Sequence, residues 1–193
     1  MQVLNWIPQR HRRRGEVEAF IRRVYHERYD AQVSSFPPCL AVRYSPLNEI
    51  VCAAGIRTAR QGFFSEVYLD QPVDRRLSGL AGVAVDRDAV FEVTTLASRS
   101  PLATAAFIEQ IGAHSEAAGF DWGFFTLSAT MRFLIERQRR ALIVLAPADP
   151  RRLPDAADWG AYYEQDPEVC AVASTRLAGL ATSKHEESHA HAG

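Results

Sequence analysis

AVFEVTTLASRSPLATAAFIEQIGAHSEAAGFDWGFFTLS, residues 89–128, is the stretch that decides the fold. Its first part, Ala89–Ala97, is rich in β-branched and aromatic residues and predicts a strand. Ser100 and Pro101 are the residue types preferred at the N-cap and at the first position of a helix. Asp121–Ser128 then has the composition of a second buried strand. A strand, a helix and another strand in this order predict a mixed α/β protein in which helices cross over a sheet.

Two further signals lie on the N-terminal side of this stretch. Val17, Phe20 and Ile21 recur at helical spacing and predict an amphipathic helix over Arg14–Tyr29. Two strand-like runs then flank the turn-forming residues SPLNE and predict a hairpin. The two strands of the hairpin are expected at Cys39–Tyr44 and Ile50–Thr58.

The remaining elements complete one domain over residues 1–182. In chain order we expect a strand or extended loop at Phe63–Leu69, a short helix through Leu80, the crossover helix to Ala118, a helix at Thr130–Arg140, a strand at Ala141–Ala146, an aromatic loop at Pro154–Gln165 and a last helix from Asp166-Pro167 to about Ala181. The polar, histidine-containing tail, residues 183–193, is expected to be disordered.

Composition excludes several classes of protein. The chain has 193 residues, with 22 basic and 23 acidic side chains, and this balance argues against a nucleic-acid partner. No apolar run approaches the roughly 20 residues that span a bilayer, and no signal-peptide pattern is present, so we expect a cytoplasmic protein. The three cysteines show no C-x-x-C spacing, and we expect free, buried thiols and no metal site.

The loop between the Ala89–Ala97 strand and the helix that follows it is the first candidate binding site. The start of a helix presents free backbone N–H groups that attract phosphate, and Ser98, Arg99, Ser100 and Thr104 add side-chain donors. The loop contains no glycine, and the alternative reading is a well-capped helix without a ligand.

Two glutamates and two tyrosines are candidates for proton transfer. Glu66 and Glu92 each lie inside an apolar run, so each carboxylate either faces water or is buried and paired. A buried carboxylate has a raised pKa and can act as a general base. Tyr162 and Tyr163 belong to an aromatic cluster with Trp159, which is either core packing or a ligand wall whose phenols could protonate a departing thiolate.

Five segments occur in a familiar order. They are SEVYLDQPV (65–73), FEVTTLAS (91–98), GFDWGFFTLSATMRFL (119–134), LAPADPRRL (145–153) and WGAYYEQDPEV (159–169). Together they resemble the bacterial thermostable hemolysin family, which is similar to the GNAT N-acyltransferases and to acyl-homoserine-lactone synthases. The resemblance implies an α/β fold of GNAT type, an α+β mixed sheet that is twisted and partly splayed, with helices on both faces. Glu66 and Glu92 match acidic positions expected in the family.

The same resemblance implies an acyltransferase. An acyl-CoA or acyl-carrier thioester would be wedged between the strands Ala89–Ala97 and Asp121–Ser128, a small-molecule amine would attack it directly, and an acyl carrier protein is a possible partner. Backbone N–H groups near Thr94–Leu96 would polarise the thioester carbonyl. Glu66 or Glu92 would accept the amine proton, and Tyr162 or Tyr163 would protonate the thiolate. The residues expected to contact the thioester are Thr94, Thr95, Leu96, Ala97, Ser98, Arg99, Ser100, Thr104 and Ser128.

Two other functions stay open. One is a membrane-active hemolysin, as the family name suggests, with the Arg14–Tyr29 helix and its arginine-rich entry lying on a membrane surface. The other is a ligand-binding module without activity on an acyltransferase scaffold, for which the glycine-free loop is the main support.

Overall fold

The structure is a computed structural model that describes residues 4–137 and 141–177. In it, hydrophobic periodicity accounts for the first helix and the hairpin. Helix α1 covers Arg14–Tyr29, as predicted, and buries Val17, Phe20 and Ile21. Strands β2 (Cys39–Tyr44) and β3 (Ile50–Thr58) pair as an antiparallel hairpin with the predicted bounds.

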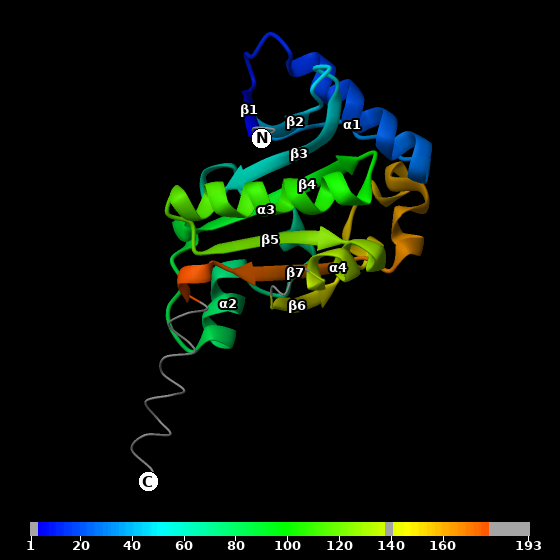
Figure 1. Cartoon of the computed structure of the whole chain (residues 1–193). Helices are drawn as coiled ribbons and strands as arrows, with labels where there is room; N and C mark the ends of the chain where they lie inside the picture. Colours follow the sequence, from blue (N-terminus) through cyan, green and yellow to red (C-terminus); the bar gives the residue numbers. More distant parts are fainter. Residues whose placement is uncertain (1–3, 138–140, 178–193) are drawn as a thin grey trace.

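A seven-stranded mixed sheet forms the centre of the molecule (Figure 1). The other elements are β1 (Leu4–Pro8), a 3₁₀ helix (Ser65–Tyr68), α2 (Val73–Ala81), β4 (Val90–Ser98), α3 (Pro101–Ala117), β5 (Trp122–Leu127), α4 (Ala129–Glu136), β6 (Leu142–Pro147), a kinked 3₁₀ segment (Ala156–Gln165) and β7 (Glu168–Ala173). The strand order is β1-β2-β3-β4-β5-β7-β6. Within the described residues β4 and β5 are the parallel pair, and the other neighbours are antiparallel. This arrangement confirms the predicted mixed α/β class.

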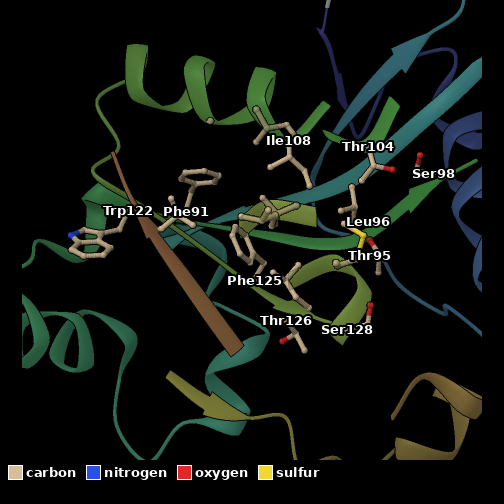
Figure 2. A pocket seen from close by; sticks show the side chains of 18 of the residues that line it. Phe91, Thr95, Leu96, Ser98, Thr104, Ile108, Trp122, Phe125, Thr126 and Ser128 are labelled. Atoms are coloured by element: carbon tan, nitrogen blue, oxygen red, sulfur yellow. The ribbon is translucent and has the colours of Figure 1, made fainter. Parts of the chain in front are cut away.

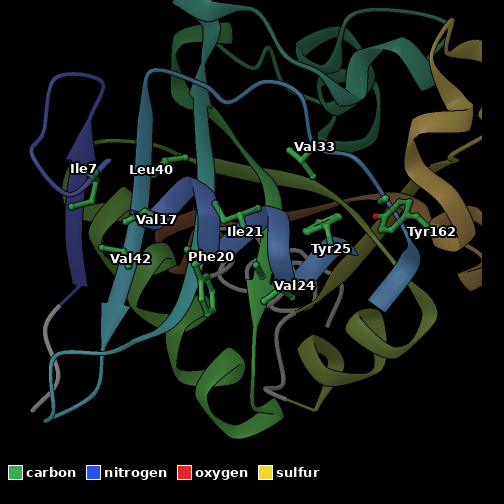
Figure 3. Close-up of a cluster of buried hydrophobic side chains, with 13 residues drawn as sticks. Ile7, Val17, Phe20, Ile21, Val24, Tyr25, Val33, Leu40, Val42 and Tyr162 are labelled. Carbon is green, nitrogen blue, oxygen red and sulfur yellow. The ribbon is translucent and has the colours of Figure 1, made fainter. Parts of the chain in front are cut away.

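Helices cover both faces of the sheet. Since successive strand residues point to opposite faces, the helices on each face contact alternate residues of a strand. Helix α1 packs against Leu40 and Val42 in the cluster that Figure 3 shows, whereas α3 packs against the intervening Ala41. Helix α2 lies on the α1 side, with Phe124, and α4 lies on the α3 side, with Phe125. We refer to these two sides as the α1 face and the α3 face.

The predicted last helix is wrong. Asp166 ends the kinked 3₁₀ segment in the left-handed conformation, and Pro167 leads directly into strand β7, which lies between β5 and β6. The run Glu168–Ala173 buries Val169, Cys170 and Ala171, as a central strand does. The rest of the expected helix and the tail, 183–193, lie outside the described residues.

Two smaller differences concern short elements. Strand β1, at Leu4–Pro8, was not predicted, because five residues at a sheet edge give little periodic signal. The predicted strand or loop at Phe63–Leu69 contains the 3₁₀ helix Ser65–Tyr68.

The arginine-rich entry to α1 contributes to the fold. Arg14 is 8% exposed and donates hydrogen bonds to the carbonyl oxygens of Ile7, Pro37 and Pro38. The Arg13 guanidinium stacks on the Tyr44 ring, 4.2 Å from its centroid. These two arginines therefore join β1, α1 and the hairpin, and neither is a free cation for a membrane surface.

Candidate functional site

Strands β4 and β5 separate partway along their length. Their parallel pairing joins Val90–Val93 to Trp122–Phe125 and stops there, although β4 continues to Ser98 and β5 to Leu127. The splayed sheet that the resemblance implied is therefore present.

A β-bulge in β4 lies where the two strands separate. On the neighbouring strand β3, Ala53 pairs with Ala97 and Gly55 pairs with Thr94, so that two residues of β4, Thr95 and Leu96, oppose one residue of β3. Thr95 has φ = +45°, a conformation that β-branched residues rarely adopt. A bulge leaves its extra residue without a regular ladder partner. The backbone is thus strained at the mouth of the opening, as is common at functional sites.

A pocket under α3 occupies the α3 face of the opening, and we call it the α3 pocket. It encloses about 1090 Å³, including its open mouth. Figure 2 shows that it follows β5 from Ser98 and Ser128 at one end to Trp122 at the other, with Ile108 and Phe125 between them. Most of its lining is apolar: Phe91, Val93, Leu96, Ile108, Ile111, Phe120, Trp122, Phe125, Leu127, Met131, Ile135 and Val172.

A second pocket, the α1 pocket, lies on the α1 face. It encloses about 770 Å³, including its mouth. Its walls are aromatic and polar: Gln32, Ser34, Ser35, Arg57, Phe64, Ser65, Tyr68, Thr94, Asp155, Asp158, Trp159 and Tyr163. Five residues line both pockets, namely Tyr25, Val93, Thr95, Thr126 and Tyr162. The two pockets therefore meet where β4 and β5 separate.

The structure brings together six of the nine residues expected to contact a thioester. The α3 pocket is lined by Thr95, Leu96, Ser98, Thr104 and Ser128, and the α1 pocket by Thr94 and Thr95. The other three do not line either pocket. Ala97 is buried in the cluster beneath α1, Arg99 stacks over Phe20, and Ser100 caps α3.

The start of α3 satisfies much of its own hydrogen bonding. The Ser98 hydroxyl accepts from the Ser100 N–H at 3.2 Å and donates to the Ser100 carbonyl at 3.0 Å. The Ser100 hydroxyl accepts from the Ala103 N–H, and the Thr104 hydroxyl donates to the Ser100 carbonyl. Ser100 is thus the predicted N-cap, and two amides that could have contacted a phosphate already have partners.

Glu92 is buried and paired, which is one of the two alternatives that the sequence left open. It is 0% exposed, and its two oxygens accept hydrogen bonds from the N–H groups of Phe64 and Ser65, each at 2.7 Å. Burial raises the pKa of Glu92, and the hydrogen bonds from Ser65 and Phe64 oppose this shift. The carboxylate is not among the described residues that line either pocket. It holds the segment that carries Phe64 and Tyr68 in the α1 pocket.

We expect Glu92→Gln to lower the free energy of unfolding by about 2 kcal/mol, because one amide N–H would then face the NH₂ group of glutamine inside the core. Chemical denaturation measures this change. An unchanged free energy of unfolding would mean that these two hydrogen bonds do not hold the Phe64–Ser65 segment in place.

Glu66 is engaged in a separate ion-pair cluster. Its carboxylate pairs with the Arg87 guanidinium at 2.5 Å and accepts from the Val73 N–H at 2.8 Å. Arg87 also pairs with Asp74 at 2.8 Å. Within the described residues, the linings of the two pockets do not include Glu66. Its position ties the 3₁₀ helix to α2.

The two candidate tyrosines differ in position. Tyr162 is buried, lines both pockets and donates to the Thr126 carbonyl at 3.2 Å. Burial raises the pKa of Tyr162 above its ordinary value, so the phenol stays protonated. Tyr163 lines the α1 pocket, and its hydroxyl is hydrogen-bonded to that of Tyr68 at 2.5 Å. Tyr162 is the one that adjoins the junction of the two pockets.

Several lining residues were not predicted from the sequence. Tyr25 and Thr126 line both pockets, Arg57 lines the α1 pocket, and Ile108 lines the α3 pocket. In the sequence Tyr25 and Ile108 look like ordinary residues of helices. Arg57 offered a weak signal, because it is the one charged side chain in the apolar run Ile50–Thr58.

The described residues also bear on metal-binding and membrane-spanning sites. Within residues 4–137 and 141–177, no group of three His, Cys, Asp or Glu side chains is placed to hold a metal ion. In the same part of the chain, no helix has both the length and the apolar character needed to cross a membrane. All three cysteines are free thiols, with Cys52 and Cys170 buried and Cys39 partly buried.

Solved structures of GNAT-like acyltransferases have folds similar to this one. The acyl-homoserine-lactone synthase LasI has 10% sequence identity to this chain and a TM-score of 0.59, with 90% of each chain covered. The N-acyl amino acid synthase FeeM from uncultured soil microbes has 14% identity and a TM-score of 0.55, covering 90% of this chain and 91% of FeeM. A putative N-acetyltransferase from Lactobacillus plantarum has 14% identity and a TM-score of 0.54, with 89% and 97% covered.

The chain belongs to the thermostable hemolysin family, whose sequence pattern matches residues 7–177. No curated protein matches the chain. The predicted family and the predicted fold are both confirmed.

Proposed function

We propose that the protein is an N-acyltransferase that transfers an acyl group from a thioester to a small-molecule amine. The observation that carries this proposal is the junction of the two pockets at Thr95 and Thr126. A thioester in the α3 pocket and an amine in the α1 pocket would meet there, through the gap between β4 and β5. The names of LasI and FeeM, which describe synthases of acylated products, agree with this chemistry.

The reaction needs no covalent enzyme intermediate. The free amine attacks the carbonyl carbon, so a C–N bond forms and the C–S bond breaks. The nitrogen loses one proton and the departing sulfur gains one, which gives an amide and a free thiol. Backbone N–H groups of the bulge at Thr95–Leu96 would donate to the carbonyl oxygen while negative charge develops on it. Neither Glu66 nor Glu92 is among the described residues that line the two pockets, so the proton would leave through the solvent of the α1 pocket.

Tyr162 would stabilise the departing sulfur. Because its raised pKa keeps the phenol protonated, it serves better as a hydrogen-bond donor to the thiolate than as a full proton donor. Its present acceptor, the Thr126 carbonyl, lies at the junction itself, so the hydroxyl already points toward the site of reaction.

The donor would carry a medium or long acyl chain. The α3 pocket follows the six residues of β5, a length of about 20 Å, and side chains such as Ile108 and Phe125 make it apolar. An acetyl group would leave most of this surface unfilled. The partly satisfied start of α3 gives the donor's phosphate few contacts, so an acyl carrier protein is as suitable a donor as CoA.

The test is to measure thioester binding and thiol release with the purified protein. Calorimetry should show tighter binding of decanoyl-CoA, or of a decanoyl acyl carrier protein, than of acetyl-CoA. Addition of a mixture of primary amines should release free thiol from the bound decanoyl donor. Absence of binding for all thioesters, whether on CoA or on a carrier protein, would overturn the proposal.

A further inference from the structure

Three polar groups of residues that line the α1 pocket have no partner. The Arg57 Nε and the hydroxyls of Thr94 and Thr95 are buried, and none of them has a hydrogen-bond partner in the described part of the chain. Arg57 lies opposite Glu92 in the sheet and its charge opposes the rise in the pKa of Glu92, but the two Glu92 oxygens accept hydrogen bonds from the N–H groups of Phe64 and Ser65. A buried donor without a partner is costly, and a charged one more so. A ligand with a negatively charged oxygen could supply the acceptor that these donors lack.

Two of these groups, those of Arg57 and Thr94, lie side by side on the α1 face. Arg57 of β3 pairs with Glu92 of β4, and Thr94 is two residues beyond Glu92, so Arg57 and Thr94 are diagonal neighbours on one face. Diagonal neighbours in a sheet are about 7–8 Å apart at Cα, which is within reach of a long side chain. A single small anion can therefore contact both the guanidinium and the hydroxyl.

The absence of a side chain at Gly55, opposite Thr94, leaves room for the Thr94 hydroxyl in its present position. Gly55 pairs with Thr94, and a Cβ at Gly55 would collide with the Thr94 hydroxyl and with the Pro37 ring. Any other residue here would push the hydroxyl away from its present position. Thr94 also precedes Thr95, the bulged residue at the junction of the pockets, so an anion bound here lies next to the reaction centre.

The charge on the other walls selects the kind of anion. Asp155 and Asp158 line the same pocket and disfavour a doubly charged phosphate, but they favour a molecule that also carries an ammonium group. The aromatic rings of Trp159 and Phe64 form an apolar part of the lining of this pocket. The chemistry that fits is a carboxylate next to an amine, with an apolar side chain.

We propose that the acceptor is an α-amino acid with an apolar side chain, whose carboxylate binds the Arg57 guanidinium and the Thr94 hydroxyl. This inference rests on the proposed N-acyltransferase function and specifies its second substrate. The carboxylate holds the adjacent amine at the opening between β4 and β5, and Arg57 is therefore a specificity-determining residue of the acceptor site.

The test compares three sets of acceptors with the full-length protein and a saturating decanoyl thioester. The sets are the twenty amino acids, their carboxamides and the corresponding decarboxylated amines, and mass spectrometry identifies the N-decanoyl products. We expect products from the amino acids at a rate at least about tenfold above the other two sets, because a charged hydrogen bond is lost when the carboxylate is absent.

Variants of Arg57 then test its role. Arg57→Leu should raise the KM for the preferred amino acid about 30-fold, and it should change the KM for the corresponding decarboxylated amine much less, because that amine has no oxygen for the guanidinium to bind. Arg57→Lys should restore part of the preference, and Arg60→Leu, an exposed arginine outside both pocket linings, should behave as wild type. A loss of preference for the carboxylate is a readout that partial unfolding does not produce.

Three results would overturn this inference. They are equal use of carboxamides or decarboxylated amines by the wild type, an equal effect of Arg57→Leu on all three sets, and thioester binding without product from any set. Loss of thioester binding itself is a separate result, which calorimetry without acceptor detects and which would instead overturn the proposed function.

Discussion

Ile108→Trp is expected to weaken the binding of decanoyl-CoA about 100-fold and to leave the binding of acetyl-CoA unchanged. Ile108 points into the middle of the α3 pocket (Figure 2), and an indole ring there would fill the space beyond the thioester. Excluding three or four methylene groups from an apolar site, at about 0.8 kcal/mol each, gives a change of this size. Isothermal titration of both thioesters measures it.

Glu109→Trp is the matched control for this variant. Glu109 follows Ile108 on α3 but is exposed, so the same bulk is added outside the pocket. The control should bind both thioesters as the wild type does. If Ile108→Trp bound decanoyl-CoA normally, the acyl chain would have to lie elsewhere, and the α3 pocket would lose its proposed role.

Tyr162→Phe is expected to lower kcat about 100-fold while the affinity for the thioester stays within a factor of about three, because it removes a hydrogen bond that forms only as the sulfur departs. Steady-state rates of thiol release, together with calorimetry, separate the two quantities. Tyr163→Phe is the control, because the Tyr163 hydroxyl contacts Tyr68 and lies on the α1 side alone.

A donor with a better leaving group sharpens this test. A decanoyl thioester of thiophenol releases a thiolate that needs less stabilisation, so Tyr162→Phe should slow its reaction much less than that of decanoyl-CoA. An equal loss with both donors would mean that Tyr162 acts before the C–S bond breaks. Thermal unfolding of the variant checks that the buried ring, without its hydroxyl, keeps the protein folded.

Local signals predicted most of the architecture. The spacing of Val17, Phe20 and Ile21 gave α1 its bounds, and Ser100-Pro101 marked the start of α3. The same type of signal failed at Asp166-Pro167, which resembles a helix start. There, tertiary structure prevails, because the run that follows is apolar enough to be a central strand between β5 and β6.

The site was predictable where it lies at the end of a strand and, through Tyr162, in the aromatic segment before β7. Thr95, Ser98 and Thr104 follow from the strand, loop and helix pattern, since that pattern places loop residues at the edge of the sheet. Arg57 and Tyr25 were not predictable, because they approach the junction from β3 and from α1. The sequence also could not decide between an exposed and a buried Glu92, since that depends on the backbone of Phe64 and Ser65, far away in the chain.

The gap between β4 and β5 has its two pockets on opposite faces of the sheet, and few residues belong to both. In the proposed reaction, substitutions in α3 would alter which donor is accepted without disturbing recognition of the amine, and changes around β3 would do the reverse. Such a division would let related proteins diversify their products by changing one half of the reaction at a time. It also gives protein engineers two walls that can be redesigned separately.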